Sequence, residues 1–192
     1  KPRVKADSQG AYVIWSDTRY NTQTPALNDI FMQRLTLEEG LSWNQELPLC
    51  INEAGDQTQA RLTTDGLGGV FVTWMDDRNE ANFDDIFIQH INSSGESSYS
   101  NDGIGLAVSD GLQINPLVRS DGFGGAFVVW GDYRTGSPGV YLQHIGQSGQ
   151  ISLEEGGREM YWGIDGNTVS TYATKPTSHY IGANETIIGW SD

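Results

Sequence analysis

Residues 121–134 read DGFGGAFVVWGDYR and residues 65–78 read DGLGGVFVTWMDDR, so one pattern occurs twice almost unchanged. A looser copy occupies residues 7–19, and a fourth begins at Glu185 with ETIIGWSD. A tryptophan marks the same position in each copy: Trp15, Trp74, Trp130 and Trp190. The intervals between these tryptophans are 59 (74 − 15), 56 (130 − 74) and 60 (190 − 130) residues. A repeat of this length predicts a stacked or radially repeated architecture.

Short strands joined by tight turns fit each copy of the pattern. In the third copy we expect strands at 117–120, 126–130 and 140–145, with a weaker fourth at 151–153 or near 160–162. The first turn holds an Asp, whose side chain can bond the following backbone, and glycines, which tolerate positive φ. Every residue of 126–130 is apolar, so we expect both faces of that strand to be covered. The matching strands are expected at 3–6, 11–15 and 30–35 in the first copy, and at 60–64, 70–74 and 86–91 in the second.

Three or four short antiparallel strands in about 55 residues fit one blade of a β-propeller, with a β-solenoid as the alternative. We therefore expect an all-β, β-propeller-like fold of repeated antiparallel blades of about four strands. The expected units are residues 1–59, 60–115 and 116–175, with the start of a fourth at 176–192. Because a typical propeller closes with four to eight blades, we expect the ring to be completed by residues outside this chain or by neighbouring chains.

Composition narrows the choice of partners. The chain has 11 Lys and Arg against 25 Asp and Glu, a net charge of −14, so it repels phosphate backbones and nucleic acid is not an expected partner. No apolar run of about 18 residues occurs, so no membrane span is expected. We expect no cofactor, because Cys50 stands alone and no Cys/His spacing is typical of zinc. The dispersed acidity leaves calcium as an alternative, but the Asp-Gly turns lack the alternating ligands of a calcium loop.

The full pattern is D-G-x-G-G-x-x-V-x-W-x-D-x-R, followed by D-I-F-x-Q-x-I and a polar glycine turn. It resembles the propeller-like repeats of large secreted or cell-surface proteins of Bacteroidetes-type bacteria. Such proteins often carry a C-terminal sorting domain for type IX secretion. The resemblance implies an extracellular or cell-surface location and a scaffold or adhesion module that binds a protein or glycan partner.

An Asp–Arg pair follows each of the first three tryptophans: Asp17 and Arg19, Asp76 and Arg78, Asp132 and Arg134. Because a motif copied into every unit usually builds that unit, we interpret these pairs and the repeated tryptophans as structural. The Asp would cap the loop and the Arg would bond carbonyl groups of a neighbouring blade. The alternative is a ring of arginines facing the propeller axis, similar to the arginine cluster with which sialidases hold a carboxylate.

Aromatic residues outside the repeated positions are the candidates for ligand binding: Trp43, Trp162, Tyr133 and Tyr161. On loops they would form a surface on which sugars stack. The alternative is that they pack over the edges of the blades.

Two further residue types recur. His90 and His144 are expected at the exposed ends of a strand face, too far apart to share a metal ion. Gln33, Gln89 and Gln143 are expected to bond backbone groups between blades.

No catalytic residue can be selected from the sequence. Glycoside hydrolysis requires two carboxyl groups placed across a cleft. The acidic pairs 38–39, 84–85 and 154–155 are instead adjacent on loops. We therefore expect a non-catalytic scaffold or binding module. The alternatives are a fragment of a propeller glycoside hydrolase or sialidase-like enzyme, and a structural subunit of a surface assembly.

Overall fold

Each copy of the repeated pattern folds into its own antiparallel sheet, referred to below as a blade. The computed structural model describes residues 1–20, 22, 26–38, 40–51, 54–79, 83–162, 177–182 and 185–189. Blade 1 contains β1 (Arg3–Ala6), β2 (Gly10–Asp17), β3 (Asp29–Thr36), β4 (Gly40–Leu41) and β5 (Leu47–Cys50). Blade 2 contains β6 (Gln57–Thr64), β7 (Val70–Asp76), β8 (Asp85–Ile91) and β9 (Ile104–Ala107). Blade 3 contains β10 (Gln113–Ser120), β11 (Ala126–Asp132), β12 (Gly139–Ile145) and β13 (Arg158–Trp162), and a fourth sheet pairs β14 (Thr177–Gly182) with β15 (Glu185–Gly189).

The strands of each blade follow in chain order from one edge to the other, as β6-β7-β8-β9 and β10-β11-β12-β13 do. In blade 1 the two short strands β4 and β5 both pair with β3 and share the fourth position. The fourth strand of blade 3 is β13, so the expected alternative at 151–153 is wrong. Ile151 makes only a single bridge to Ile145.

The first strands of blades 2 and 3 start earlier than expected because each contains a bulge. The register shifts between Thr58 and Arg61 in β6, and between Ile114 and Leu117 in β10. Gln59 (φ 50°) and Asn115 (φ 55°) adopt left-handed backbone at these two bulges. A bulge built on Gln or Asn carries no glycine signal, so the strand pattern could not reveal it.

The turns between the first two strands behave as their sequence predicts. Asp65 Oδ1 accepts hydrogen bonds from the backbone N–H groups of Leu67 (2.7 Å) and Gly69 (2.8 Å). Gly66 and Gly68 have φ of 82° and 95°, a left-handed conformation in which a side chain is strained. Residues 121–125 repeat this turn, so the two hairpins have matching shapes.

The hydrophobic cores lie between blades. One core joins blade 1 to blade 2 through Tyr12, Ile14 and Met32 on one side and Val70, Val72 and Trp74 on the other. A second joins blade 2 to blade 3, with Phe71 and Ile88 facing Val128 and Trp130. All seven residues of β7 are buried, which confirms the expectation that the apolar second strand is covered on both faces.

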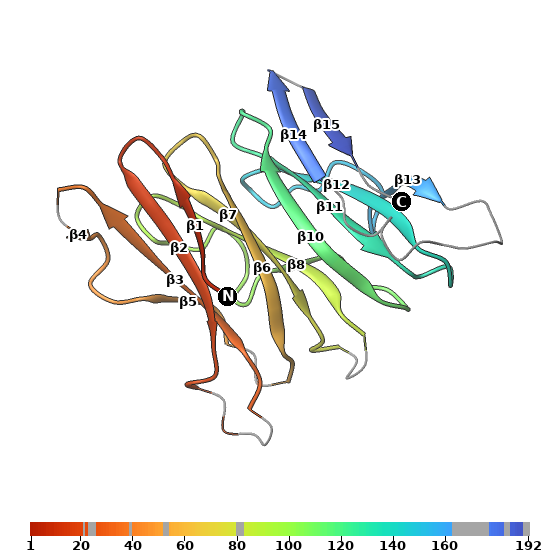
Figure 1. Cartoon of the computed structure of the whole chain (residues 1–192), viewed down its shortest axis with the longest axis horizontal. Coiled ribbons are helices and arrows are strands. Elements are labelled where there is room, and N and C mark those ends of the chain that lie inside the picture. Colours follow the sequence, from red (N-terminus) through yellow and green to blue (C-terminus); the bar gives the residue numbers. More distant parts are fainter. Residues whose placement is uncertain are drawn as a thin grey trace.

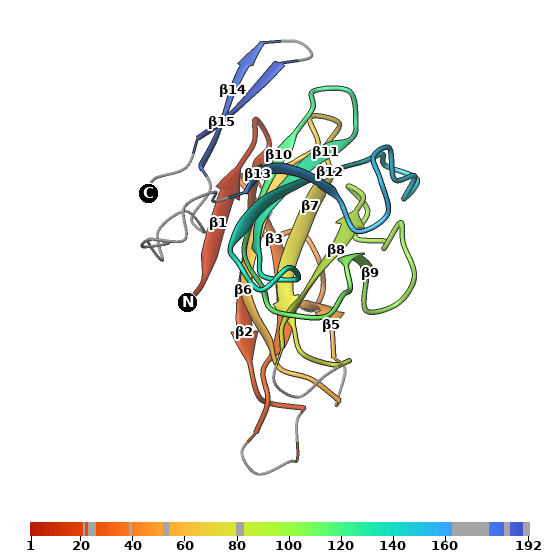
Figure 2. The same cartoon turned by 90° about the vertical axis from the view of Figure 1, so that its right-hand side faces the viewer.

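The blades stand side by side with their first strands on a common face (Figure 1). We call the surface formed by β1, β6 and β10 the inner face, and Figure 2 shows these strands on one side with β5, β8 and β9 on the other. This radial order, from a first strand inside to a fourth outside, is that of propeller blades. No helix of the described residues is long and apolar enough to cross a membrane.

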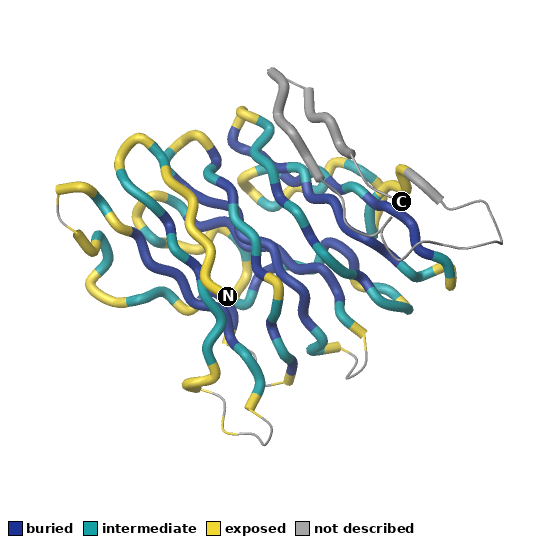
Figure 3. Tube along the Cα trace, in the orientation of Figure 1, coloured by how far each residue is buried: buried dark blue, intermediate teal, exposed yellow. Residues whose placement is uncertain are grey.

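One face of blade 1, the face that points away from blade 2, is not covered by any described residue. The equivalent faces of blades 2 and 3 are covered by the preceding blade. Figure 3 shows β1 as exposed, whereas β7 and β8 are buried. Leu35 is 37% exposed, while Ile91 and Ile145 at the equivalent positions are 0% exposed. Trp15 is only partly buried, although Trp74 and Trp130 are fully buried.

Candidate functional site: repeated polar clusters and the inner face

Asp76 lies at the centre of a buried polar cluster at the end of β7. Its Oδ2 accepts a hydrogen bond from Trp74 Nε1 (2.9 Å) and pairs with Arg78 Nη2, and its Oδ1 accepts the Arg78 backbone N–H (3.0 Å). Arg78 Nη2 also donates to Cys50 Sγ of blade 1 (2.9 Å). The guanidinium lies 4.1 Å from the centre of the Phe87 ring. Burial lowers the pKa of Arg78, but the Asp76 bond and the neighbouring negative charges together outweigh burial and raise this pKa above its ordinary value.

The same cluster occurs in blades 3 and 1. Trp130 Nε1 donates to Asp132 Oδ2 (2.9 Å), and Arg134 donates to Asp132 through Nε (2.9 Å) and its backbone N–H (2.9 Å). Arg134 lies over Tyr141 on β12. In blade 1, Arg19 pairs with Asp17. These arginines contact the third strands and the segments beyond them, not the first strands, so they do not form a ring on the inner face. Arg78 and Arg134 donate to the carbonyl groups of Asp102 and Gly156 in their own blades, so the expectation that they bond carbonyl groups of a neighbouring blade is wrong.

A second repeated cluster joins the turn to the third strand. His90 Nε2 lies 3.0 Å from Asp65 Oδ2, and His90 Nδ1 lies 2.7 Å from Ser98 Oγ. His90 is fully buried, so the expectation of an exposed histidine is wrong: its hydrogen-bond partners come from the turn and from the segment before β9. The turn aspartate that caps the hairpin therefore also holds the histidine.

Blades 3 and 1 contain equivalents of this second cluster. His144 bonds Asp121 (2.8 Å) and Ser152 (2.9 Å), and in blade 1 Arg34 replaces the histidine and pairs with Asp7 (3.0 Å). Burial raises the pKa of Asp121, but the His144 bond and the N–H groups of the turn outweigh burial and lower it. The same Ser–His–Asp arrangement occurs in two blades, and in blade 1 an arginine takes the place of the histidine. We therefore interpret it as a structure that holds the turn, and not as a nucleophile site.

The repeated glutamines act within a blade. Gln89 Nε2 donates to the Ser100 carbonyl (2.9 Å), and Gln89 Oε1 accepts the N–H groups of His90 (3.0 Å) and Tyr99 (3.1 Å). Gln143 makes the same three bonds in blade 3. The expectation that these side chains join different blades is wrong, because the segment that approaches the third strand belongs to the same blade.

Trp43 packs at the junction of blades 1 and 2. It lies against Tyr12, with 6.1 Å between ring centres, and a Cβ added to Gly95 of blade 2 would lie 3.0 Å from its indole. Tyr99 repeats this contact one blade further: a Cβ on Gly149 would lie 3.3 Å from its ring, and its hydroxyl donates to the Gly146 carbonyl (2.8 Å). Both aromatic rings thus act as wedges between blades, the alternative that the sequence left open for Trp43.

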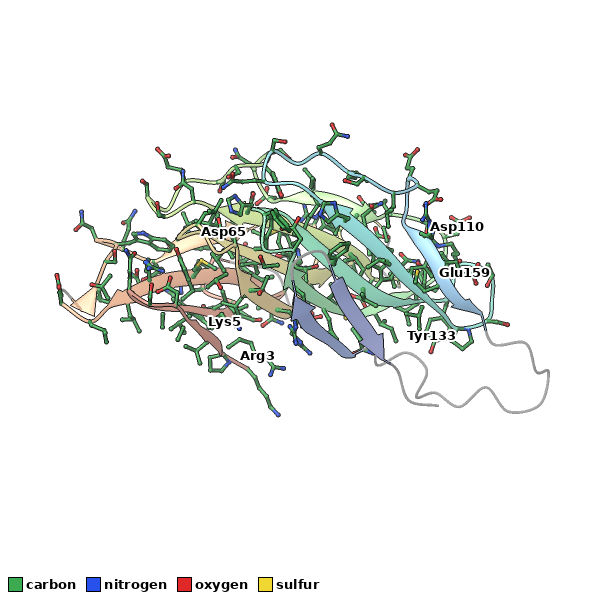
Figure 4. The ribbon with its side chains drawn as sticks, turned by 90° about the horizontal axis from the view of Figure 1, so that it is seen from above. Arg3, Lys5, Asp65, Asp110, Tyr133 and Glu159 are labelled. Carbon is green, nitrogen blue, oxygen red and sulfur yellow. The ribbon has the colours of Figure 1, made fainter. Side chains whose placement is uncertain are left out.

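Of the other candidate aromatic residues, only the side chain of Tyr133 is described, and it does not lie near Trp43. Tyr133 is half-buried on the loop after β11, at the opposite end of the strands, where Figure 4 labels it. Tyr161 and Trp162 lie on β13, and their side chains are outside the described residues. Trp190 also lies outside the described residues. A ligand-binding role for these residues stays a prediction.

Acidic side chains gather at the end of blade 2 that faces away from the Asp-Gly turns. Asp56 Oδ1 accepts bonds from the backbone N–H (2.6 Å) and the side-chain amide (2.8 Å) of Asn28, and Asp77 Oδ1 accepts the Asp56 N–H (2.5 Å). Burial, together with the charges of Asp77 and Asp56, raises the pKa of Asp84 to about 6. Among the described residues, no three His, Cys, Asp or Glu side chains are placed to hold a metal ion.

The inner face carries basic residues that we did not single out in the sequence. Arg3 and Lys5 lie on β1, Arg61 on β6 and Arg119 on β10. The signal that could have revealed them is their spacing from the turn aspartate: Arg3 and Arg61 precede it by four residues, and Lys5 and Arg119 precede it by two.

Comparison with known proteins identifies the fold class. No protein-family model matches the chain, and no curated protein matches its sequence. The fold is similar to that of an endo-arabinase from Bacteroides thetaiotaomicron (10% identity, TM-score 0.54), over 98% of this chain and 68% of that one. It is also similar to a Penicillium chrysogenum α-L-arabinanase complexed with arabinobiose (14% identity, TM-score 0.54), over 98% of this chain and 58% of that one. Arabinanases are β-propellers, so this chain has a β-propeller fold built of antiparallel four-stranded blades.

Proposed function

We propose that the chain is a non-catalytic binding or scaffold module of a β-propeller protein at an extracellular or cell-surface location. One observation carries the proposal: β1, β6 and β10, which form the inner face, contain no Asp or Glu. Glycoside hydrolysis needs a pair of carboxyl groups about 5–9.5 Å apart on either side of the bond. The conspicuous polar clusters of the described blades are instead engaged in holding each blade together.

The uncovered face of blade 1 supports a scaffold role. Val13, Trp15 and Leu35 are partly exposed, but their equivalents in blades 2 and 3 are fully buried against the preceding blade. Burial of such side chains contributes about 1.5–3 kcal/mol each, so leaving this face in water is unfavourable. We expect a further blade of the same kind to cover it, from the same protein or from a neighbouring chain.

A matched pair of substitutions tests whether a further blade covers this face of blade 1. Ile91→Asn should lower the urea midpoint of this chain strongly, because it buries an amide in an apolar core. Leu35→Asn should leave the midpoint of this chain nearly unchanged, but should lower that of the native protein as isolated from cells. If Leu35→Asn is equally harmless in the native protein, no blade covers this face.

The non-catalytic role is tested by measuring binding and hydrolysis together on the native protein. We expect retention on a glycan or protein partner and no release of reducing sugar from arabinan or from other plant and bacterial polysaccharides. Release of sugar above the level of a heat-denatured control would overturn the proposal. Cell fractionation tests the location, which rests on the resemblance of the repeat, and recovery in the cytoplasm would contradict it.

Glycoside hydrolysis is the second candidate function, favoured by the arabinanase structures and by Asp84. A carboxyl group with a pKa of about 6 can act as a general acid near neutral pH. If the native protein cleaves arabinan, Asp84→Asn should abolish the release of sugar and Glu154→Gln, at an exposed site, should not. Cleavage that survives Asp84→Asn would rule out this residue as the acid.

A further inference from the structure

The hairpin turns between the first and second strands lie side by side at one end of the blades, along the upper edge of Figure 1. They occupy residues 7–10, 65–69 and 121–125. The backbone bond that closes the turn joins Asp7 to Gly10 in blade 1, but Asp65 to Gly69 in blade 2. The turn of blade 1 is therefore one residue shorter (10 − 7 against 69 − 65) than the turn beside it.

Between blades 2 and 3, side chains occupy the space between the two turns. A Cβ added to Gly124 would lie 3.1 Å from Leu67 Cδ1, so the leucine lies against the turn of blade 3. Ser120 Oγ donates to the carbonyl group of Asp65 (3.4 Å) and joins the strand of blade 3 to the turn of blade 2. The two full-length turns are therefore in direct contact.

Between blades 1 and 2, the equivalent space is open. Gln9 takes the place of Leu67, since its backbone N–H makes the same bond to the turn aspartate. A Cβ added to Gly68 would meet only Ser93 of its own blade (3.4 Å), and one added to Gly66 would meet no described residue within 4 Å. The result is a groove of about 580 Å³. This volume is in the range of ligand pockets, about 300–1,000 Å³.

The walls of this groove combine neutral polar side chains with one apolar side chain. Ser8 and Gln9 come from the turn of blade 1. Thr64 and Ser93 come from blade 2. None of these four side chains forms a hydrogen bond with another described residue, so their hydroxyl and amide groups can bond a ligand. Leu67 supplies the apolar part of the wall and is 67% exposed.

The groove carries no unbalanced charge. Asp7 is the only ionisable residue among the described residues that line it. Its Oδ1 accepts the N–H groups of Gln9 (2.8 Å) and Gly10 (2.8 Å), and its Oδ2 pairs with the buried Arg34 (3.0 Å). Burial raises the pKa of Asp7, but these bonds together outweigh burial and lower it. Because the chain has a net charge of −14 and the groove offers no free cation, the groove favours a neutral ligand over an anion.

We propose that the groove between the turns of blades 1 and 2 binds a segment of a neutral polysaccharide. A sugar ring has hydroxyl groups at its edge and C–H groups on its faces, so it fits a wall of hydroxyl and amide groups beside a leucine. Gly66 and Gly68 have no side chain, which lets a ring approach the backbone of the turn. This inference rests on the binding role proposed above and names the site and the ligand class.

Isothermal titration of the native protein with neutral arabinohexaose, xylohexaose and mannohexaose, and with anionic hexagalacturonate, tests the proposal. We expect a neutral hexasaccharide to bind more tightly than hexagalacturonate, with an affinity that changes little as salt rises. Ser93→Tyr should weaken this binding about tenfold or more, because the added ring would occupy the groove. Ser94→Tyr, the same change at the next exposed residue of the same turn, is the matched control and should not weaken it.

Thr64→Val gives a second test that does not fill the groove. Valine has the shape of threonine without the hydroxyl group, and that hydroxyl bonds no other described residue. The loss of one neutral hydrogen bond to the sugar should weaken binding about three- to tenfold. Thr58→Val, on the same strand but away from the groove, should not weaken it. Unchanged thermal melting would show that the variants are folded.

Two outcomes would overturn the inference. The first is that no neutral hexasaccharide binds, or that hexagalacturonate binds more tightly than all three. A protein partner or an anionic glycan could then still fulfil the proposed binding role, without this groove. The second is an equal affinity of the Ser93→Tyr and Ser94→Tyr variants for the sugar, which would mean that the sugar binds elsewhere. Hydrolysis of a bound sugar would instead overturn the non-catalytic role, and weaker binding by Ser93→Tyr alone would still support the groove.

Discussion

Asp76→Asn is expected to destabilise the protein far more than the same change at Asp17. The Asp76 side chain is 0% exposed and Arg78 is 12% exposed, so the pair is almost removed from water. The substitution removes the negative charge and leaves the Arg78 guanidinium uncompensated, while Trp74 Nε1 loses its best acceptor. Breaking one partner of a buried pair costs about 3–5 kcal/mol. We expect a loss of that size in the free energy of unfolding, measured by urea titration with tryptophan fluorescence.

Asp17→Asn is the matched control, because the repeat places the same pair in a different environment. The Asp17 and Arg19 side chains are 26% and 39% exposed, and both water and the second ion-pair partner Glu46 can stabilise Arg19 when Asp17 is replaced. Exposed ion pairs contribute little, so the control should cost a small fraction of the loss at Asp76. Equal shifts of the urea midpoint for the two variants would refute the argument that burial, rather than the motif, determines the contribution.

Three other changes give further tests. Gly157→Ala should cost about 1–3 kcal/mol more than Gly136→Ala by thermal melting: both glycines have positive φ, but only at Gly157 would the Cβ meet another side chain, 2.4 Å from Trp130 Cη2. The pKa of Asp84 is raised to about 6 by burial and neighbouring aspartates, so the folded state binds this proton more tightly and stability falls from about pH 4 to pH 6. Asp84→Asn should flatten that fall and raise the urea midpoint at pH 7, and an unchanged pH profile would contradict this. Tyr99→Phe removes one hydrogen bond to the next blade and should cost about 0.5–1.5 kcal/mol in urea titration, whereas no loss would mean that packing alone holds the ring.

Much of the fold could be predicted from local chemistry. The glycines and aspartate of residues 121–125 determine a turn wherever they occur, because their preferences act over a few residues. The apolar run that follows predicts a strand covered on both sides, and six of the seven residues of β11 are buried. The repeat itself then predicts several similar blades, since each copy must bury the same apolar face.

The polar clusters could not be predicted in the same way. His90 is separated from Asp65 by 25 residues, and its burial depends on how the turn folds back over β8. The bulge at Gln59 has no glycine to mark it, although it positions Arg61. The role of Trp43 was equally hidden, because its equivalent in blade 2 is a tyrosine and the sequences of the two loops differ.

The sequence by itself determined the repeat, the turns and the strands, because these follow from preferences of residues close together in the chain. Only the tertiary structure decided which faces meet, such as Tyr99 with the turn of the next blade, 47 residues away at Gly146. It also decided that β1 and β6, the first strands of two blades, lie side by side. Contacts of this kind depend on the packing of whole sheets, and no short segment contains that information.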